Sequence, residues 1–443
     1  MKSSTCVITV MALCMLLPLG PAGASMVTLQ VFGNANMDDT IDDLDIEYVQ
    51  GIIAGENEVT DLADANRDGQ VDASDVTQIN SIINKEATNL TLMDSGGNIV
   101  TISLPVERII LYHHQCGEVI QILGAQDKVV GVRDTFKDQV RRFPEISTKP
   151  SIGSGYDPDI EAVLSLDPDL ILAYSSYQFP DPELLDSKLP DDVAVLRMDC
   201  ECNSGVDVVK ESVVTLGYLL DKAENVEEYL EWHDKYIDEI AERISQVPED
   251  ERLRFFLESS GTETLSRTAI GNGHAAHQIC VLAGGDNIAA GNVPLQSNSE
   301  VEYGSVETEW VLEQNPEVIV CRAMGEGIRP YELDDTSILA AHADEIRELP
   351  GFAAVDAAAN DRIYIITNDY AISPNYPTTV ALLAKWFYPD LFEDVDPVAI
   401  HQEYMDLMGR RLVDMAIYLI VGALFLDQAT ASETKKAVLA RWL

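Results

Sequence analysis

Two acidic segments near the amino terminus carry oxygen-bearing side chains at the spacing of a cation-binding loop. The first begins at Asn34 and the second at Asp64, so the pattern repeats at an offset of thirty residues. In each segment, carboxylates, amides and one backbone carbonyl fall at the positions from which a wrapped loop ligates Ca²⁺. The predicted calcium ligands are Asn34, Asn36, Asp38, Thr40, Asp45, Asp64, Asn66, Asp68, Gln70 and Asp75.

Each loop precedes a helical run, at 46–53 and 76–83, whose apolar residues can pack the two units face to face. The pair resembles type I dockerin modules, a resemblance that implies calcium-dependent attachment to a cohesin-bearing protein; the alternative is a structural calcium clip. Asn34 replaces the usual first Asp, and Asp39 takes a turn position usually held by Gly. We therefore expect the first site to bind calcium more weakly than the second, and the module to fold on binding two calcium ions.

The charge balance narrows the choice of partners. The chain has 75 acidic and 29 basic residues, a formal net charge of -46, and 46% hydrophobic residues. A surface this acidic repels nucleic acid and anionic lipid, whereas the apolar content is ample for packed cores. We therefore expect a globular protein that binds no nucleic acid.

Both ends of the chain carry apolar runs. The first, from Cys6 to Leu19, follows Lys2 and precedes Ala22-Gly-Ala24, which is typical of a cleaved signal peptide and predicts export. The second, at 412–426, follows two arginines and is short for a bilayer span. A packed or interfacial helix is the favoured interpretation of that tail, and a membrane anchor is the alternative.

The cysteines that follow the signal peptide do not form a disulfide framework. They are Cys116, Cys200, Cys202, Cys280 and Cys321, an odd number without scaffold-like spacing, which allows one or two disulfides at most. Cys200 and Cys202 could ligate a metal, but buried thiols are the commoner reason for such cysteines.

From Asn89 onward, strand-like and helix-like segments alternate, as in α/β proteins. A short helix, a proline and a buried strand follow one another at 160–172 and again at 306–320, which predicts two lobes with one local plan. The charged helical run at 223–247 is long for a crossover helix and is interpreted as a strut between the lobes. The predicted fold is α/β, with two Rossmann-like lobes joined by a long helix and preceded by a small all-α, paired EF-hand-like domain. The predicted boundaries are 1–24 for the signal peptide, 27–88 for the calcium module, 89–222 and 248–408 for the lobes, 223–247 for the connecting helix and 409–443 for the tail.

Residues from about 90 to 408 resemble the class III periplasmic binding proteins of iron-chelate, haem and cobalamin uptake. The resemblance rests on the segments 94–108, 159–172, 271–288 and 384–389, the last reading Ala-Lys-Trp-Phe-Tyr-Pro. It implies a ligand held between two lobes, an ABC permease as partner, and a metal chelate (siderophore or haem) or a corrinoid as cargo.

Candidate ligand residues lie at the carboxyl ends of the predicted strands, where open α/β sheets bind ligands. Aromatic faces there could stack on a macrocycle or catechol, an arginine could pair with a ligand carboxylate or phosphate, and a His or Tyr could reach iron. The candidates are Tyr112, His113, His114, Tyr156, Tyr177, Ser260, Arg322, Asn368 and Tyr370. His274 and His277 could share a metal, but the resemblance places them at the start of a packed helix.

The resemblance also implies an acidic docking residue on each lobe that meets arginines of the transporter, at Glu161 and Glu309. Neither a nucleophile elbow nor a paired-carboxylate context is evident, so we expect no enzyme, and a metal-dependent hydrolase is a remote alternative. A second alternative is a cell-surface scaffold or adhesion protein in which the dockerin-like module carries the function.

Overall fold

The computed structural model describes residues 27–175, 179–190, 192–201, 205–259, 265–294, 301–324, 328 and 330–409. The predicted signal peptide, the tail beyond Gly409, Cys202, and the candidate ligand residues Tyr177 and Ser260 lie outside these residues. Within the described part of the chain, every helix is too short or too polar to cross a membrane.

The amino-terminal module contains two helices, α1 (Asp43–Ala54) and α2 (Ala73–Ile83). Both begin with a capping box, in which an aspartate at the N-cap and an aspartate three residues later bond to each other's backbone N–H groups. The helices bury Val49, Ile79 and Ile82 between them and the loops. The predicted small helical domain is therefore present.

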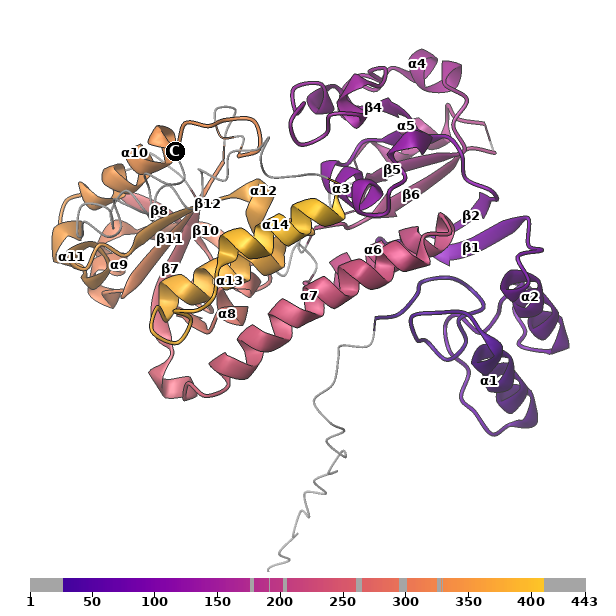
Figure 1. The fold of residues 1–443 in the computed structure, drawn as a ribbon, viewed down its shortest axis with the longest axis horizontal. Helices are drawn as coiled ribbons and strands as arrows, with labels where there is room; N and C mark the ends of the chain where they lie inside the picture. The colour runs from indigo at the N-terminus through magenta and orange to yellow at the C-terminus, as the bar shows by residue number, and fades with distance from the viewer. Residues whose placement is uncertain are drawn as a thin grey trace, which may run out of the picture.

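The module packs against a hairpin that precedes the first lobe (Figure 1). The hairpin strands are β1 (Asn89–Met93) and β2 (Ile99–Ser103). Val31, ahead of the first loop, pairs antiparallel with Leu92. Apolar residues of the module and of the first lobe form one continuous buried cluster, so the module and this lobe share a core.

The first lobe is a four-stranded parallel sheet with the order β4-β3-β5-β6. Its elements are β3 (Ile109–Leu111), α3 (His114–Ile122), η1 (Gln126–Lys128), β4 (Val129–Val132), η2 (Asp134–Phe136), η3 (Ile146–Thr148), α4 (Ile160–Ser165), β5 (Leu170–Tyr174), α5 (Pro182–Asp186), β6 (Ala194–Met198) and α6 (Asp207–Leu219). The strands are buried on both faces, as expected when helices cover a parallel sheet.

The second lobe is a six-stranded sheet with the order β10-β8-β7-β11-β12, in which β9 also pairs with β7. Its elements are η5 (Glu249–Glu251), β7 (Leu253–Ser259), β8 (Ser266–Ile270), α8 (Ala275–Leu282), β9 (Gly285–Asn287), β10 (Tyr303–Glu307), α9 (Thr308–Gln314), β11 (Val318–Ala323), α10 (Ser337–Arg347), η6 (Phe352–Ala354), α11 (Asp356–Ala359), β12 (Ile363–Thr367), α12 (Asn368–Ala371), α13 (Tyr376–Phe387) and α14 (Pro397–Leu407). Strands β8 and β10 run antiparallel, so this sheet is mixed. Two lobes built on parallel strands are confirmed, with this departure at one edge.

One long helix, α7 (Ala223–Ile244), runs along both lobes (Figure 1). Its buried face carries Tyr229, Trp232 and Ile240, and it contacts α6 on one side and α13 and α14 on the other. It ends three residues before the predicted boundary, because Ser245 is the C-cap and Pro248 follows closely.

The motif of a short helix, a proline and a buried strand, at 160–172 and 306–320, has the same local geometry in both lobes. Asp167 and Asn315 adopt left-handed backbone conformations with φ of 47° and 46°, each directly before the proline. The residue after each proline is acidic: Asp169 accepts hydrogen bonds from the N–H groups of residues 107 and 108, and Glu317 accepts one from the N–H of residue 254. In each lobe, therefore, the acidic residue after the proline binds the backbone at the amino-terminal end of the lobe's first strand.

Candidate ligand-binding site

The loops at the carboxyl ends of the strands in the two lobes contact each other. Arg141, in the loop that follows β4, pairs with Asp334 at 2.5 Å between Nη1 and Oδ1. The backbone N–H groups of Arg141 and Arg142 both donate to the Glu332 carboxylate, which lies in the loop after β11. The edges of the two sheets at which α/β proteins bind ligands therefore face one another.

Arg142 lies at the centre of this contact and is fully buried. Its guanidinium is 2.8 Å from the Glu118 carboxylate and 3.3 Å from Asp369, and it lies 5.1 Å from the Tyr331 ring centroid. Burial raises the pKa of the Glu118 carboxyl, and the Arg142 charge opposes that rise. This group joins α3 of the first lobe to α12 of the second.

In the first lobe, a half-buried cation lies over aromatic rings. The Arg133 guanidinium is 5.6 Å from the Tyr174 ring centroid and 5.3 Å from that of Phe179. Tyr156 packs edge-on against Phe179 at 4.5 Å and is 92% exposed. Arg133 Nε donates to the Thr135 hydroxyl at 2.6 Å, which fixes the head group. The surface combines a positive charge with accessible aromatic faces.

In the second lobe, the buried Arg322 contacts His274, with Nη1 2.9 Å from Nε2. Burial and the Arg322 charge lower the pKa of His274 to about 3, so this imidazole is neutral at ordinary pH and can accept the arginine's hydrogen bond. His274 also caps α8, and Asn287 bonds to His277 at 3.0 Å. These contacts favour the structural interpretation of the two histidines over a shared metal.

Two of the predicted tyrosines lie in the packed interior. Tyr112 is fully buried in a cluster with Ile110 and Ile171. Tyr370 is 5% exposed, stacks on Tyr331 at 5.1 Å, and bonds through its hydroxyl to His401. This placement corrects the expectation that these two rings offer free faces to a ligand, because apolar and aromatic neighbours cover them.

The other predicted residues are distributed between surface and interior. His114 is half-buried beside Arg133 and bonds to Thr135 at 2.8 Å. His113 is fully buried and packs against Tyr174, with the ring centroids 3.7 Å apart and the rings tilted by 35°. Asn368 is half-buried at the start of α12. Tyr156, His114 and Asn368 therefore remain the accessible predicted residues, whereas Arg322 is buried against His274.

Sequence reasoning missed Arg133, Arg142 and Tyr174. Arg133 directly follows β4, so its position at the carboxyl end of a strand was a usable signal in the sequence. The central role of Arg142 had no such signal, because its partners Glu118 and Asp369 lie 24 and 227 residues away in the chain.

The two amino-terminal loops repeat the same hydrogen bonds. In the second loop, Asp75 accepts from the N–H groups of Asn66 and Asp72 at 3.1 and 2.8 Å. In the first, Asp45 accepts from the equivalent groups at 3.1 and 2.9 Å. The side chains at positions 3 and 5 accept from backbone N–H groups two residues onward in both loops. The oxygen donors of each loop are thus gathered into one turn, an arrangement that suits a hard cation.

The loops differ at the two positions noted in the sequence. Asp64 accepts from the N–H of Gly69, whose φ of 89° is a left-handed conformation, and the first loop has no equivalent bond among the described residues. Asn34 is fully buried, and its amide donates to the carbonyls of Leu29 and Asp38. The first loop is thus closed in part by an uncharged amide.

Glu161 and Glu309 occupy equivalent places in the two lobes. Each lies in the first turn of a short helix, α4 or α9, and each is exposed. Neither makes an ion pair with a described residue. Their carboxylates are therefore available to a partner.

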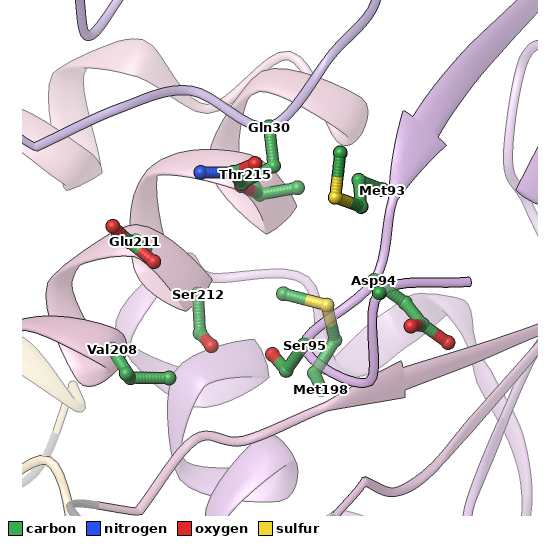
Figure 2. A pocket seen from close by; sticks show the side chains of 10 residues that line it. Gln30, Met93, Asp94, Ser95, Met198, Val208, Glu211, Ser212 and Thr215 are labelled. Carbon is green, nitrogen blue, oxygen red and sulfur yellow. The ribbon is translucent and has the colours of Figure 1, made fainter. Parts of the chain in front are cut away.

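A pocket of about 290 Å³ lies where the amino-terminal segment, the hairpin and α6 meet (Figure 2). Gln30, Met93, Met198 and Ser212 are among its lining residues. None of the predicted ligand residues lines it, and it lies on the hairpin side of the first lobe. It is therefore separate from the facing strand ends.

A family model described as "Periplasmic binding protein" matches residues 109–370. The molybdate-binding protein MolA of Haemophilus influenzae is 24% identical over 323 residues, covering 67% of this chain and 84% of that protein. An uncharacterised ABC transporter substrate-binding lipoprotein, YvrC of Bacillus subtilis, is 22% identical over 70% of this chain and 88% of its own. A cobalamin-binding protein of Halobacterium salinarum is 25% identical over 61% of this chain and 67% of its own.

Solved structures show the same fold. The molybdate-bound MolA structure has a TM-score of 0.56 at 20% identity and covers 72% of this chain and 98% of that one. The Ni(II)-bound CeuE structure of Helicobacter pylori has a TM-score of 0.54 at 20% identity and covers 73% of this chain and 97% of that one.

Proposed function

We propose, from the premise that this chain belongs to the periplasmic binding protein family, that it captures an anionic metal chelate or a corrinoid and delivers it to an ABC importer. The family consists of solute-binding proteins, so the chain is not an enzyme. The finer assignment of the ligand rests on the chemistry of the facing strand ends.

The observation that carries the ligand class is Arg133 above two aromatic rings, beside the exposed Tyr156. The guanidinium can pair with an anionic group of a ligand, and the exposed ring of Tyr156 can stack on a flat one, because the Tyr174 ring is already in contact with both Arg133 and His113. In a chain with a formal net charge of -46, an arginine at this edge also marks the place to which an anion is drawn. One relative is named for binding cobalamin, which supports a corrinoid, and a siderophore or haem fits the same chemistry.

Replacing Arg133 by Gln tests this site. We expect a loss of roughly 10- to 150-fold in affinity, because a charge-assisted hydrogen bond contributes roughly 1.5–3 kcal/mol. Lys137→Gln is the matched control, since it removes the same charge from an exposed position four residues onward. Isothermal titration with cobalamin, a ferric catecholate siderophore, haem and molybdate measures both variants against the parent.

The outcomes of that titration distinguish the proposed ligand class from the alternatives. Binding of one chelate or corrinoid, weakened by Arg133→Gln and unchanged by Lys137→Gln, supports the proposal. Binding of molybdate alone would contradict the proposed chelate or corrinoid and would identify the ligand as an oxyanion. No binding of any of the four would favour the alternative in which the chain is a surface scaffold whose amino-terminal module carries the function.

We also propose that the amino-terminal module is a dockerin-like unit that attaches the protein to a cohesin when calcium is bound. Its support is the repeated loop geometry, in which carboxylates occupy matched positions and the closing aspartate, Asp45 or Asp75, accepts from equivalent backbone N–H groups. A calcium ion would neutralise the mutual repulsion of those carboxylates. A pull-down with cohesin modules, in calcium and in chelator, distinguishes this role from a structural calcium clip. Calcium-dependent capture supports attachment to a cohesin, and no capture in calcium supports the clip.

The two calcium loops are expected to differ in affinity. Asp64→Ala should weaken calcium binding more than Asn34→Ala, because affinity rises with the number of charged ligands and only the second loop has an anionic first position. Calcium titration of the chelator-treated full chain, with the exposed Asp61→Ala as control, measures the difference. An equal loss in both loop variants would contradict the ranking.

A further inference from the structure

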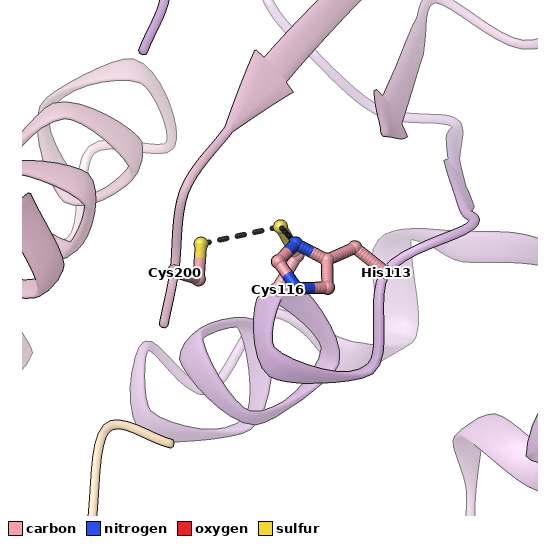
Figure 3. A group of neighbouring side chains, drawn as sticks. All are labelled: His113, Cys116 and Cys200. Atoms are coloured by element: carbon pink, nitrogen blue, oxygen red, sulfur yellow. Dashed lines mark hydrogen bonds between the residues drawn. The ribbon is translucent and has the colours of Figure 1, made fainter. Parts of the chain in front are cut away.

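Three sulfur and nitrogen ligands meet inside the first lobe, away from the surface described above (Figure 3). His113 and Cys116 lie at the start of α3, directly after β3, and Cys200 follows β6. All three side chains are fully buried. The Cys116 sulfur is 3.2 Å from that of Cys200 and 3.3 Å from His113 Nδ1, and one ligand atom from each residue lies within 4.8 Å of the others.

The surroundings of this cluster favour a cation. Asp199 and Glu201 flank Cys200 and are 2% and 4% exposed. The other ring nitrogen of His113, Nε2, is buried without a hydrogen-bond partner among the described residues, and Glu201 Oε2 lies 4.0 Å from it. A metal on Nδ1 would leave the ring proton on Nε2, where the Glu201 carboxylate is the nearest acceptor.

We propose that His113, Cys116 and Cys200 form a resident site for a thiophilic cation with a filled d shell, Zn²⁺ or Cu⁺. Two thiolates and one imidazole are the donors that such ions select. In a tetrahedral zinc site the sulfurs stand roughly 3.8 Å apart, so a small outward movement from 3.2 Å accommodates the ion. The Met198 carbonyl, 3.2 Å from His113 Nδ1, can supply an oxygen donor at the fourth position.

The charges of the ion and its ligands balance when the metal binds, which suits a buried site. When Zn²⁺ binds, both thiols lose their protons to solvent, and two thiolates with a neutral imidazole then surround a dication. The ion and its three ligands together are electrically neutral, so binding adds no net charge to the interior. The His113 Nε2–H can point to the Glu201 carboxylate, which orients the imidazole as acidic partners do in other metal sites.

The site would join two strands that are not neighbours. Strand β5 lies between β3 and β6 in the sheet, so the metal would bridge across its carboxyl end. That end carries Tyr174, which packs against His113 with ring centroids 3.7 Å apart and lies under Arg133. The metal would therefore hold the aromatic floor of the ligand surface in place, although the inference itself does not depend on the identity of that ligand.

Metal analysis of the full chain tests the proposal. The protein is purified with calcium present and without chelator, and zinc and copper are counted by mass spectrometry. We expect one zinc or copper ion per chain, and a fall in Tm of about 5 °C or more when a zinc- and copper-selective chelator removes it in excess calcium. Cobalt added to the reduced metal-free chain should give thiolate-to-metal charge-transfer absorption, a signature that a calcium loop cannot produce.

Variants assign the signal to these residues. Cys200→Ser should abolish the stoichiometric metal and the cobalt absorption, whereas Cys280→Ser, also at a fully buried cysteine but in the second lobe, should keep both. Should Cys200→Ser fold poorly, His113→Gln with the same cobalt assay replaces it. Absence of cobalt absorption in the reduced parent chain, or a Cys116–Cys200 disulfide in the protein recovered from its exported state, would overturn the proposal.

Discussion

A chain that carries both Glu161→Arg and Glu309→Arg is expected to bind its ligand with unchanged affinity and to support no transport. Each carboxylate is exposed in the first turn of a short helix, at an equivalent place in its lobe. Charge-assisted pairs between acidic residues and arginines set both orientation and encounter rate in protein complexes. Reversing both charges turns two attractions into repulsions, so docking to the permease should fail.

The measurement is uptake into vesicles that contain the reconstituted importer, alongside titration of the ligand in solution. Glu183→Arg with Glu393→Arg makes the same charge change at exposed positions outside α4 and α9 and serves as the control. The simpler role of Glu161 and Glu309, favouring their helix N-termini, is worth only about 0.3–1 kcal/mol each. Transport that survives the double change would show that these carboxylates have only that role.

The largest loss of stability is expected from Arg142→Met. Removal of this guanidinium leaves Glu118, which is also fully buried, without its cation at 2.8 Å, and removes the link to Asp369. Breaking a buried ion pair from one side typically costs about 3–5 kcal/mol. Urea denaturation followed by tryptophan fluorescence measures the change in the free energy of unfolding.

Arg141→Met is the matched control for that change. Its pair with Asp334 is exposed to solvent, with side chains 39% and 59% accessible, so its loss should cost about 0–1 kcal/mol. The defect of Arg142→Met should also shrink as the pH falls, because burial already raises the pKa of Glu118 and loss of the arginine raises it further. The penalty is then present at neutral pH and is relieved as Glu118 becomes protonated at low pH. Equal losses in the two arginine variants would contradict the central role of Arg142.

The amino-acid sequence determined the features that depend on neighbours along the chain. The offset of thirty residues between the acidic loops predicted the two capped helices, because a loop and its cap are local hydrogen-bonded turns. The helix-Pro-strand repeat predicted two lobes of similar plan, since a proline disfavours the helical conformation of the residue before it.

The tertiary structure alone decided which strand-end residues are accessible and which chemical groups meet. Tyr112 and His113 follow the same strand as His114, yet only His114 reaches the surface, because the direction of a side chain at a strand-helix junction depends on what packs there. Cys116 and Cys200 are 84 residues apart, and their sulfurs meet only because β3 and β6 belong to one sheet. Glu118, Arg142 and Asp369 also come together only in the tertiary structure. Buried charges are stable only beside opposite charges, and the packing of the two lobes supplies those partners from distant parts of the chain.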